Sequence, residues 1–198
     1  MNAVILCGGK SSRMGRDKAL IKINDRPVVS IIYDSLKVIF DEVALSVKTG
    51  TDEYHALGYR LIEDNLPGSS PLVGIYSALQ ELKGTHIFVI ACDMPLIDIG
   101  FIAAMRNEIS AGYDVIVPVT ANGIEPLYGF YSKNCINEIK NRIDRGDHKI
   151  INFYPEVKTR QIDIRTGQWA GVDIKFSLNL NTPADMKKLE RTILELNL

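Results

Sequence analysis

Glycines and cations are concentrated in residues 6–18, where the chain reads LCGGKSSRMGRDK. Three glycines and four Lys or Arg residues share these thirteen positions. Glycine lets a backbone approach a ligand with its N–H groups converging, and the cations offset the roughly four negative charges of a nucleoside triphosphate. The segment predicts a phosphate-binding loop, and a solvated loop that merely follows a strand is the alternative.

Two better-known phosphate loops do not fit this segment. A Walker A loop ending at Gly9-Lys10-Ser11 would need a glycine at position 4, where this chain has Val4. The G-x-G-x-x-G pattern of dinucleotide-binding domains is also missing from the sequence. The sequence therefore argues against a P-loop ATPase and against a dehydrogenase.

A carboxylate follows the most apolar run of the chain. Residues 87–91 read IFVIA, and Cys92, Asp93 and Met94 come next. A strand that is apolar on both faces belongs in the middle of a sheet, and ligands of open α/β sheets bind outside the carboxyl ends of the strands. Asp93 is thus a candidate metal ligand, with a helix N-cap as the alternative.

A third polar segment, EDNLPGSSPLVG, occupies residues 63–74. Its Asp64 can accept hydrogen bonds from a base edge or a ribose hydroxyl, and Gly74 allows close approach to a ligand or a strand. Taken alone, a turn followed by a helix start explains the segment more simply. Together, however, the three loops supply what attack on an α-phosphorus needs without a protein nucleophile: donors, cations and a metal carboxylate.

The elements that must position these loops alternate between short apolar runs and segments of helical period. This alternation is typical of βαβ units, so we expect an α/β fold with a mostly parallel sheet and helices on both faces. The expected strands cover residues 3–6, 43–47, 59–62, 87–91, 114–119, 127–131 and 161–164. The expected helices cover residues 28–39, 72–82, 99–109, 133–145 and 183–196, the last with Thr182 as its N-cap.

Length and composition indicate an ordinary globular protein. The 198 residues, 46% hydrophobic and 24% charged, are enough for one substantial core, so we expect a single domain over 1–198. A net charge of -1 gives no general attraction to nucleic acid or to anionic membranes. The three cysteines lack the spacing of a zinc or redox site, and no stretch approaches the roughly 20 apolar residues of a membrane span. We expect a cytoplasmic protein with no nucleic-acid and no membrane partner.

The sequence resembles the molybdenum cofactor guanylyltransferase family nearly from end to end. The resemblance rests on LCGGKSSRMGRDKA, SPLVGI and ACDMP, and on PLYG at 126–129 and NLNTPAD at 179–185. It implies a Rossmann-like nucleotidyltransferase fold that requires Mg²⁺, with an NTP-binding half roughly at 1–100 and an acceptor-binding half roughly at 101–198. The implied reaction joins GTP to the phosphate of molybdenum-molybdopterin, giving the guanine dinucleotide cofactor and pyrophosphate. Maturation proteins of molybdoenzymes are further possible partners.

The resemblance also implies roles for single residues. It assigns nucleotide contacts to Leu6, Cys7, Gly8, Gly9, Lys18, Asp64 and Asp93. It assigns catalysis to Lys18, Arg13 and Asp93, with Asp93 as the Mg²⁺ ligand. The chain departs from the family where Cys7 replaces the usual alanine and Ser70 a glycine. It also reads Ser46-Val47-Lys48 near the end of the second strand, where the family places an asparagine on the nucleotide. The role of this last position stays open.

Other functions remain possible at this point. A sister transferase would use CTP or another NTP on molybdopterin or on a sugar or alcohol phosphate, and a non-catalytic module would only bind GTP. The Gly8-Gly9 pair, in place of the Ala-Ala-Gly of the cytidylyl branch, favours guanine. Residues 133–160 hold seven Lys or Arg against four Asp or Glu, which suits an anionic pterin about as well as a solvated helix face. The three histidines show no ligand spacing, and we interpret them as surface or core residues.

Overall fold

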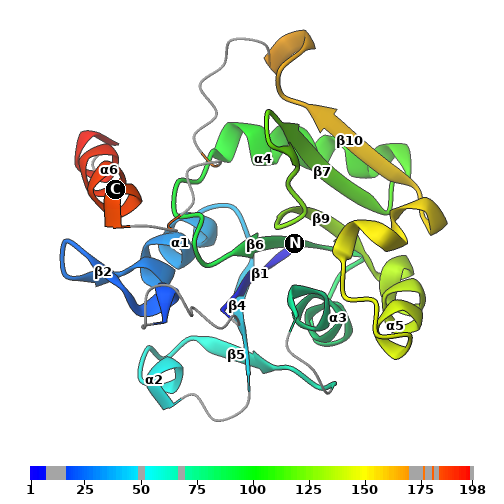
Figure 1. The fold of residues 1–198 in the computed structure, drawn as a ribbon, viewed down its shortest axis with the longest axis horizontal. Coiled ribbons are helices and arrows are strands. Elements are labelled where there is room, and N and C mark those ends of the chain that lie inside the picture. Colours follow the sequence, from blue (N-terminus) through cyan, green and yellow to red (C-terminus); the bar gives the residue numbers. More distant parts are fainter. Residues whose placement is uncertain are drawn as a thin grey trace.

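The computed structural model describes residues 1–7, 17–48, 52–66, 70–169, 176, 180 and 183–196 (Figure 1). Eight strands form one sheet in the order β10-β7-β9-β6-β1-β4-β5, with β8 beside β7, and β2 and β3 form a separate hairpin. The strands are β1 Asn2–Leu6, β2 Lys22–Ile23, β3 Arg26–Pro27, β4 Glu42–Val47, β5 Arg60–Glu63, β6 His86–Ala91, β7 Val115–Thr120, β8 Gly123–Ile124, β9 Tyr128–Ser132 and β10 Thr159–Asp163.

The five predicted helices are present, and the short helix α2 and several 3-10 helices were not predicted. The α-helices are α1 Val28–Lys37, α2 Asp52–His55, α3 Pro71–Glu81, α4 Ile99–Asn107, α5 Ile136–Asp144 and α6 Pro183–Leu196. The 3-10 helices are η1 Lys18–Leu20, η2 Glu108–Ala111, η3 Lys133–Cys135, η4 Ile150–Glu156 and η5 Gly167–Trp169. The expected helices at 99–109 and 133–145 are thus each divided into an α-helix and a 3-10 turn. Thr182, the expected N-cap of α6, lies outside the described residues.

The strand β6 lies in the middle of the sheet, as its apolar sequence predicts. All six of its residues are buried. It pairs with β1 in parallel, where Leu6 is opposite Ala91, and with β9 in antiparallel, where Ile90 is opposite Tyr128. The sheet is therefore mostly parallel, with β9 and the short β8 running against the others.

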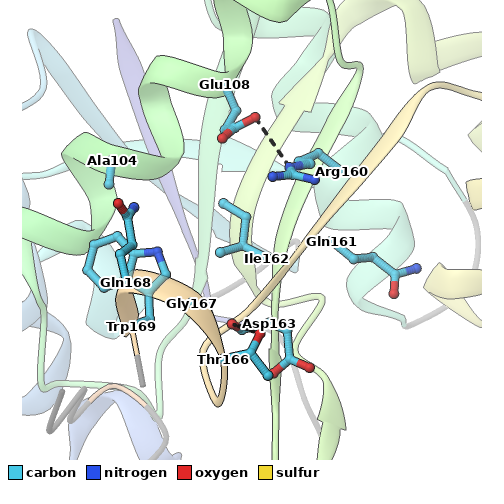
Figure 2. Close-up of a pocket in the computed structure, with 10 residues that line it drawn as sticks. All are labelled: Ala104, Glu108, Arg160, Gln161, Ile162, Asp163, Thr166, Gly167, Gln168 and Trp169. Atoms are coloured by element: carbon cyan, nitrogen blue, oxygen red, sulfur yellow. Dashed lines mark hydrogen bonds and ion pairs between the residues drawn. The ribbon is translucent and has the colours of Figure 1, made fainter. Parts of the chain in front are cut away.

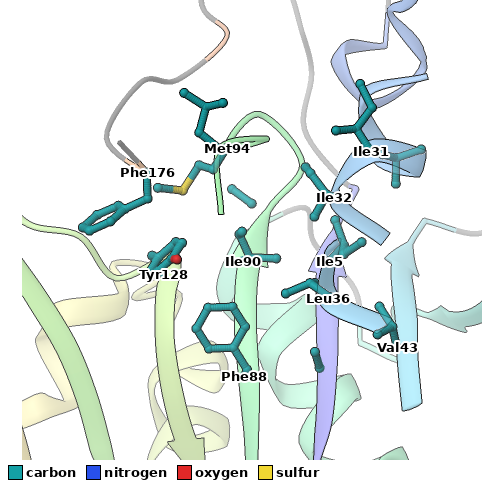
Figure 3. Packing of buried hydrophobic residues seen from close by; sticks show 14 of the residues in the cluster. Ile5, Ile31, Ile32, Leu36, Val43, Phe88, Ile90, Met94, Tyr128 and Phe176 are labelled. Carbon is teal, nitrogen blue, oxygen red and sulfur yellow. The ribbon is translucent and has the colours of Figure 1, made fainter. Parts of the chain in front are cut away.

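Helices cover both faces of the sheet, and each face has its own apolar core. Alternate residues of one strand point to opposite faces, so Ile5 belongs to one cluster and Leu6 to the other. The first cluster joins β1, β4 and β6 to α1, α4 and α6, and Figure 3 shows Phe88 and Ile90 of β6 in its centre. The second cluster joins the opposite face to α3, α5 and η4. The expected two-sided packing is confirmed.

The start of α3 lies unusually close to the sheet because Gly74 has no side chain. A Cβ atom added at Gly74 would lie 2.6 Å from the Ser46 Oγ atom and 3.1 Å from the Leu6 Cδ2 atom. The glycine therefore permits the close approach to a strand that the sequence predicts. It brings the start of α3 next to the carboxyl ends of β1 and β4.

Candidate functional site

The loop after β1 and the loop after β6 meet at one edge of the sheet. The Lys18 Nζ atom lies 3.3 Å from the Asp93 Oδ2 atom, and both side chains are about one-fifth exposed, at 20% and 21%. Their proximity follows from the parallel pairing of β1 with β6, which places both carboxyl ends together. A cation and a carboxylate thus lie together, partly buried, at the carboxyl ends of β1 and β6. The predicted phosphate and metal site requires this arrangement.

Asp93 lies in the turn that follows β6 and is held there by backbone hydrogen bonds. The Cys92 N–H donates to the Leu6 carbonyl at 3.2 Å, and the Asp93 carbonyl accepts from the Leu180 N–H at 2.8 Å. The N-cap of the next helix, α4, is Asp98, whose carboxylate accepts from the Phe101 N–H at 2.8 Å. The alternative that Asp93 serves as this helix N-cap is therefore wrong.

Tyr54, which the sequence analysis did not identify, joins Cys7 and Asp17 at the two ends of the glycine-rich segment. Its buried hydroxyl lies 2.8 Å from the Asp17 carboxylate and 3.3 Å from the Cys7 carbonyl. The other Asp17 oxygen accepts from the Ala19 N–H at 3.0 Å, capping η1, which begins at Lys18. Burial raises the pKa of Tyr54 well above its ordinary value, so it stays a neutral donor. Tyr54 is therefore a positioning residue for Lys18.

The second predicted carboxylate lies at the carboxyl ends of β4 and β5. The Ser46 hydroxyl donates to the Asp64 carboxylate at 3.2 Å, and the Asp64 N–H donates to the Val47 carbonyl at 3.0 Å. Burial raises the pKa of Asp64, an effect that the Ser46 hydrogen bond and the positive charge of Lys48 reduce. Ser46 and Lys48, whose role the sequence left open, thus both act on Asp64.

A third carboxylate, that of Glu125, lies close enough to Asp93 to experience its charge. The sequence analysis did not identify Glu125 as a site residue. Its carboxylate accepts from the Leu127 N–H at 3.3 Å, and its own N–H donates to the Pro118 carbonyl at 2.9 Å. Burial raises the pKa of Glu125, and the negative charge of Asp93 raises it further. The only sequence signal for Glu125 is its position directly before the PLYG segment.

The remaining predicted site residues belong to the segment that leaves β1. Leu6 and Cys7 are buried, each only 6% exposed, with their side chains in the two opposite cores. Burial raises the pKa of the Cys7 thiol, which keeps it protonated. Gly8, Gly9 and Arg13 lie outside the described residues.

The described surface contains cavities large enough for a small molecule. A cavity of about 560 Å³ lies between α4, β10 and η5, three strands away from β6 (Figure 2). It contains the ion pair between Arg160 and Glu108, with a distance of 3.3 Å, and none of the predicted site residues. A second cavity, of about 460 Å³, lies between the start of α3, the segment around β8, and η4. Its lining contains none of the predicted site residues, but it includes Ile124 and Pro126, which flank Glu125.

Within the described ranges, no three or more His, Cys, Asp or Glu residues gather as a metal cluster. Mg²⁺ does not require such a cluster, because it is commonly bound by one or two carboxylates together with substrate phosphates and waters. Asp93, with Glu125 nearby, is a donor set of this kind. Among the helices that the structure describes, none has the length and apolar character needed to cross a bilayer.

Comparison with known proteins agrees with this geometry. The family model for the MobA-like NTP transferase domain matches residues 3–159. A protein of Carboxydothermus hydrogenoformans named "Probable molybdenum cofactor guanylyltransferase" is 36% identical over 96% of this chain and 94% of its own. The molybdenum cofactor guanylyltransferase of Campylobacter jejuni is 31% identical over 96% of this chain and 95% of its own.

A solved structure shares the fold over the whole chain. The crystal structure of molybdopterin-guanine dinucleotide biosynthesis protein A from Archaeoglobus fulgidus covers 98% of this chain with all of its own length. The TM-score is 0.84 at 20% sequence identity, so this likeness concerns the fold. The Rossmann-like nucleotidyltransferase fold is thereby confirmed. With the family match and the full-length relatives, it follows that the chain belongs to the molybdenum cofactor guanylyltransferase family.

Proposed function

We propose that this protein transfers GMP from GTP to the phosphate of molybdenum-molybdopterin, giving the guanine dinucleotide cofactor and pyrophosphate. The observation that carries the proposal is the pairing of Lys18 with Asp93 at the carboxyl ends of the two central parallel strands. The names of the full-length relatives support the substrate assignment. The location is proposed to be the cytoplasm, where the three free thiols would stay reduced.

The reaction needs charge neutralisation more than it needs a protein nucleophile. An oxygen of the acceptor phosphate attacks the α-phosphorus of GTP, and the bond from the α-phosphorus to the bridging oxygen breaks as pyrophosphate leaves. Lys18 would turn from Asp93 to the α- and β-phosphates and offset the charge that develops there, and Arg13 would assist on the phosphates. Phosphate is already anionic at neutral pH, so no side chain has to act as a general base.

The carboxylates near Lys18 fit a hard divalent cation. We propose Asp93 as the Mg²⁺ ligand, with Glu125 close enough to add negative charge. Bound Mg²⁺ would supply positive charge to the phosphate oxygens. Asp93 itself would hold its oxygen toward the phosphates, because the turn after β6 is fixed by backbone hydrogen bonds on both sides.

The nucleoside would be bound by the neighbouring strands of the first half. We propose contacts from Leu6, Cys7, Gly8 and Gly9, and from Asp64. Burial raises the pKa of Asp64, and N–H groups of guanine or ribose hydroxyls would stabilise its ionised carboxylate by donating to it. Residues up to about 100 would then form the nucleotide half, and the remainder the acceptor half.

A pyrophosphate-release assay tests the proposal directly. The protein is incubated with Mg²⁺, molybdenum-molybdopterin and GTP, CTP, UTP or ATP, and thermal midpoints are measured with each nucleotide alone. We expect release with GTP and the largest thermal shift with GTP. Equal shifts for the four nucleotides would remove the guanine assignment. Failure of the wild type to release pyrophosphate from any of them would favour a GTP-binding module instead.

A further inference from the structure

Two cysteines lie side by side at the carboxyl ends of the central parallel strands. The register of β1 and β6 places Leu6 opposite Ala91. The next residues along these strands are Cys7 and Cys92, and the Cys92 N–H continues the pairing by donating to the Leu6 carbonyl at 3.2 Å. Neighbouring strands lie about 4.8 Å apart, inside the range of roughly 4.4–6.8 Å between the Cα atoms of disulfide-bonded cysteines. The two backbones are therefore close enough for a disulfide.

The side chains of the two cysteines also point to the same face of the sheet. Cys7 is part of the first apolar cluster, and Cys92 packs against that cluster. Burial raises the pKa of the Cys7 thiol, and a hydrogen bond with the Cys92 thiol raises it further. The two thiols are thus within hydrogen-bonding distance of each other. The third cysteine, Cys135, belongs to the cluster on the opposite face, so the sheet separates it from both.

The two thiols differ in their access to solvent. Cys7 is only 6% exposed, and its thiol donates to the Ile5 carbonyl at 3.6 Å. Cys92 is partly exposed, because it lies in the turn after β6. A dissolved oxidant therefore reaches Cys92 first. Cys7 is the neighbouring thiol that can then displace the oxidant from Cys92.

A bond between these two sulfur atoms would act directly on the proposed nucleotide site. Cys7 precedes the Gly8-Gly9 pair, and Cys92 precedes Asp93. The Cβ atoms of a disulfide lie about 3.8 Å apart, closer than the strand spacing of about 4.8 Å, so bond formation must move the ends of β1 and β6. The 3.3 Å contact between Lys18 and Asp93 depends on the positions of those two ends.

We propose that Cys7 and Cys92 form a reversible disulfide that switches off nucleotide binding under oxidising conditions. The oxidant is a low-molecular-weight disulfide such as oxidised glutathione. The Cys92 sulfur bonds to one sulfur of the oxidant and releases one thiol, and the Cys7 sulfur then bonds to Cys92 and releases the second thiol. The protons of the two protein thiols leave on the two released thiols. Formation of the bond is independent of the proposed function, whereas its effect on activity rests on that function.

The test treats the full-length protein with oxidised glutathione and then with dithiothreitol. Peptide mass spectrometry, after alkylation of the remaining thiols, shows which cysteines are joined. The GTP-induced thermal shift and the rate of pyrophosphate release are measured for the reduced, oxidised and re-reduced forms. Cys92→Ala and Cys7→Ala each remove one partner and are compared with their own reduced forms. Cys135→Ala is the matched control, because it removes the cysteine on the opposite face.

We expect the oxidised wild type and the oxidised Cys135→Ala variant to contain the bond between Cys7 and Cys92. Both should lose the GTP-induced thermal shift and release pyrophosphate about a hundredfold more slowly, because the phosphate-binding groups are displaced. Dithiothreitol should restore both properties. Oxidised Cys92→Ala should keep its thermal shift, and Cys7→Ala should stop at the intermediate, with one glutathione on Cys92.

Two results would overturn the proposal: absence of the linked peptide from the oxidised wild type, or an unchanged thermal shift once the bond has formed. Failure of the proposed function gives a different result. A protein that releases no pyrophosphate when reduced, but forms the bond and loses its GTP-induced thermal shift when oxidised, would refute the transferase reaction and leave the disulfide switch standing.

Discussion

Two carboxylates at the same edge of the sheet, Asp93 and Asp64, have opposite surroundings. Asp93 follows the central strand β6 and lies beside the ammonium group of Lys18. Asp64 follows β5, the strand at one side of the sheet. Its carboxylate accepts a hydrogen bond from the neutral Ser46 hydroxyl. Burial raises the pKa of Asp64, so the folded protein disfavours its ionised form.

The difference fits two tasks within the proposed binding site. A carboxylate beside a cation can exchange that partner for a metal ion while phosphates take over the cation, so the Asp93 corner suits the charged part of a nucleotide. A partly buried carboxylate with few donors is stabilised when a ligand supplies N–H or O–H groups, which suits the base or the ribose. Four substitutions test this division, from the largest expected effect to the smallest.

The strongest test removes the charge of Asp93. We expect Asp93→Asn to lower the rate of pyrophosphate release about a thousandfold, because the proposed metal ligand at the reacting phosphates is lost. The control is Asp98→Asn in the same loop, which keeps an oxygen to cap α4 and should react normally. Circular dichroism of both variants should match the wild type. A near-normal rate for Asp93→Asn would remove Asp93 from catalysis.

The second test disturbs the packing around Ser46, whose hydroxyl donates to Asp64. Gly74→Ala places a methyl group 2.6 Å from the Ser46 Oγ atom, and we expect it to destabilise the fold by about 1–3 kcal/mol. Gly100→Ala in α4 is the control: its methyl group would make only an ordinary contact at 3.5 Å, and alanine should add about 0.5–1 kcal/mol of helix stability. Urea denaturation measures both changes. Similar stabilities for the two variants would show that α3 can move away from β4 at little cost.

The third test, Asp64→Asn, should change binding and stability in opposite directions. We expect the affinity for GTP to fall about tenfold, because a charged acceptor is lost. Without nucleotide at pH 7, the thermal midpoint should rise, since the raised folded pKa means that ionisation opposes folding there. As the pH falls through the folded pKa toward the unfolded value of about 3.9, this gain should disappear. A variant that is less stable than the wild type at pH 7 would contradict the assigned role of burial.

The smallest expected effect concerns Glu125, whose pKa burial and the charge of Asp93 both raise. Glu125→Gln should raise the thermal midpoint of the ligand-free protein by about 2 °C at pH 7. The gain should vanish below pH about 4.3, where the unfolded chain also binds the proton. Glu53→Gln, at an exposed position of α2, should leave the midpoint unchanged at both pH values. Equal midpoints for the two variants at pH 7 would show that the Glu125 carboxylate is well solvated.

Much of the architecture was accessible from local sequence patterns. Apolar runs marked the strands and helical periodicity marked the helices, and both depend on residues close together in the chain. The meeting of Lys18 with Asp93 was also predictable, because the carboxyl ends of parallel strands lie at one edge. Gly74 likewise indicated a close approach of α3 to the sheet.

Other features depended on contacts between distant parts of the chain. Alternating apolar residues do not reveal the direction of a strand, so only the pairing with β6 established that β9 runs in reverse. Tyr54 looked like any aromatic residue until the fold placed its hydroxyl between Cys7 and Asp17. The local sequence determined which residues form strands, helices and polar loops. Tertiary packing alone decided which carboxylates are desolvated, because desolvation depends on neighbours brought from elsewhere in the chain.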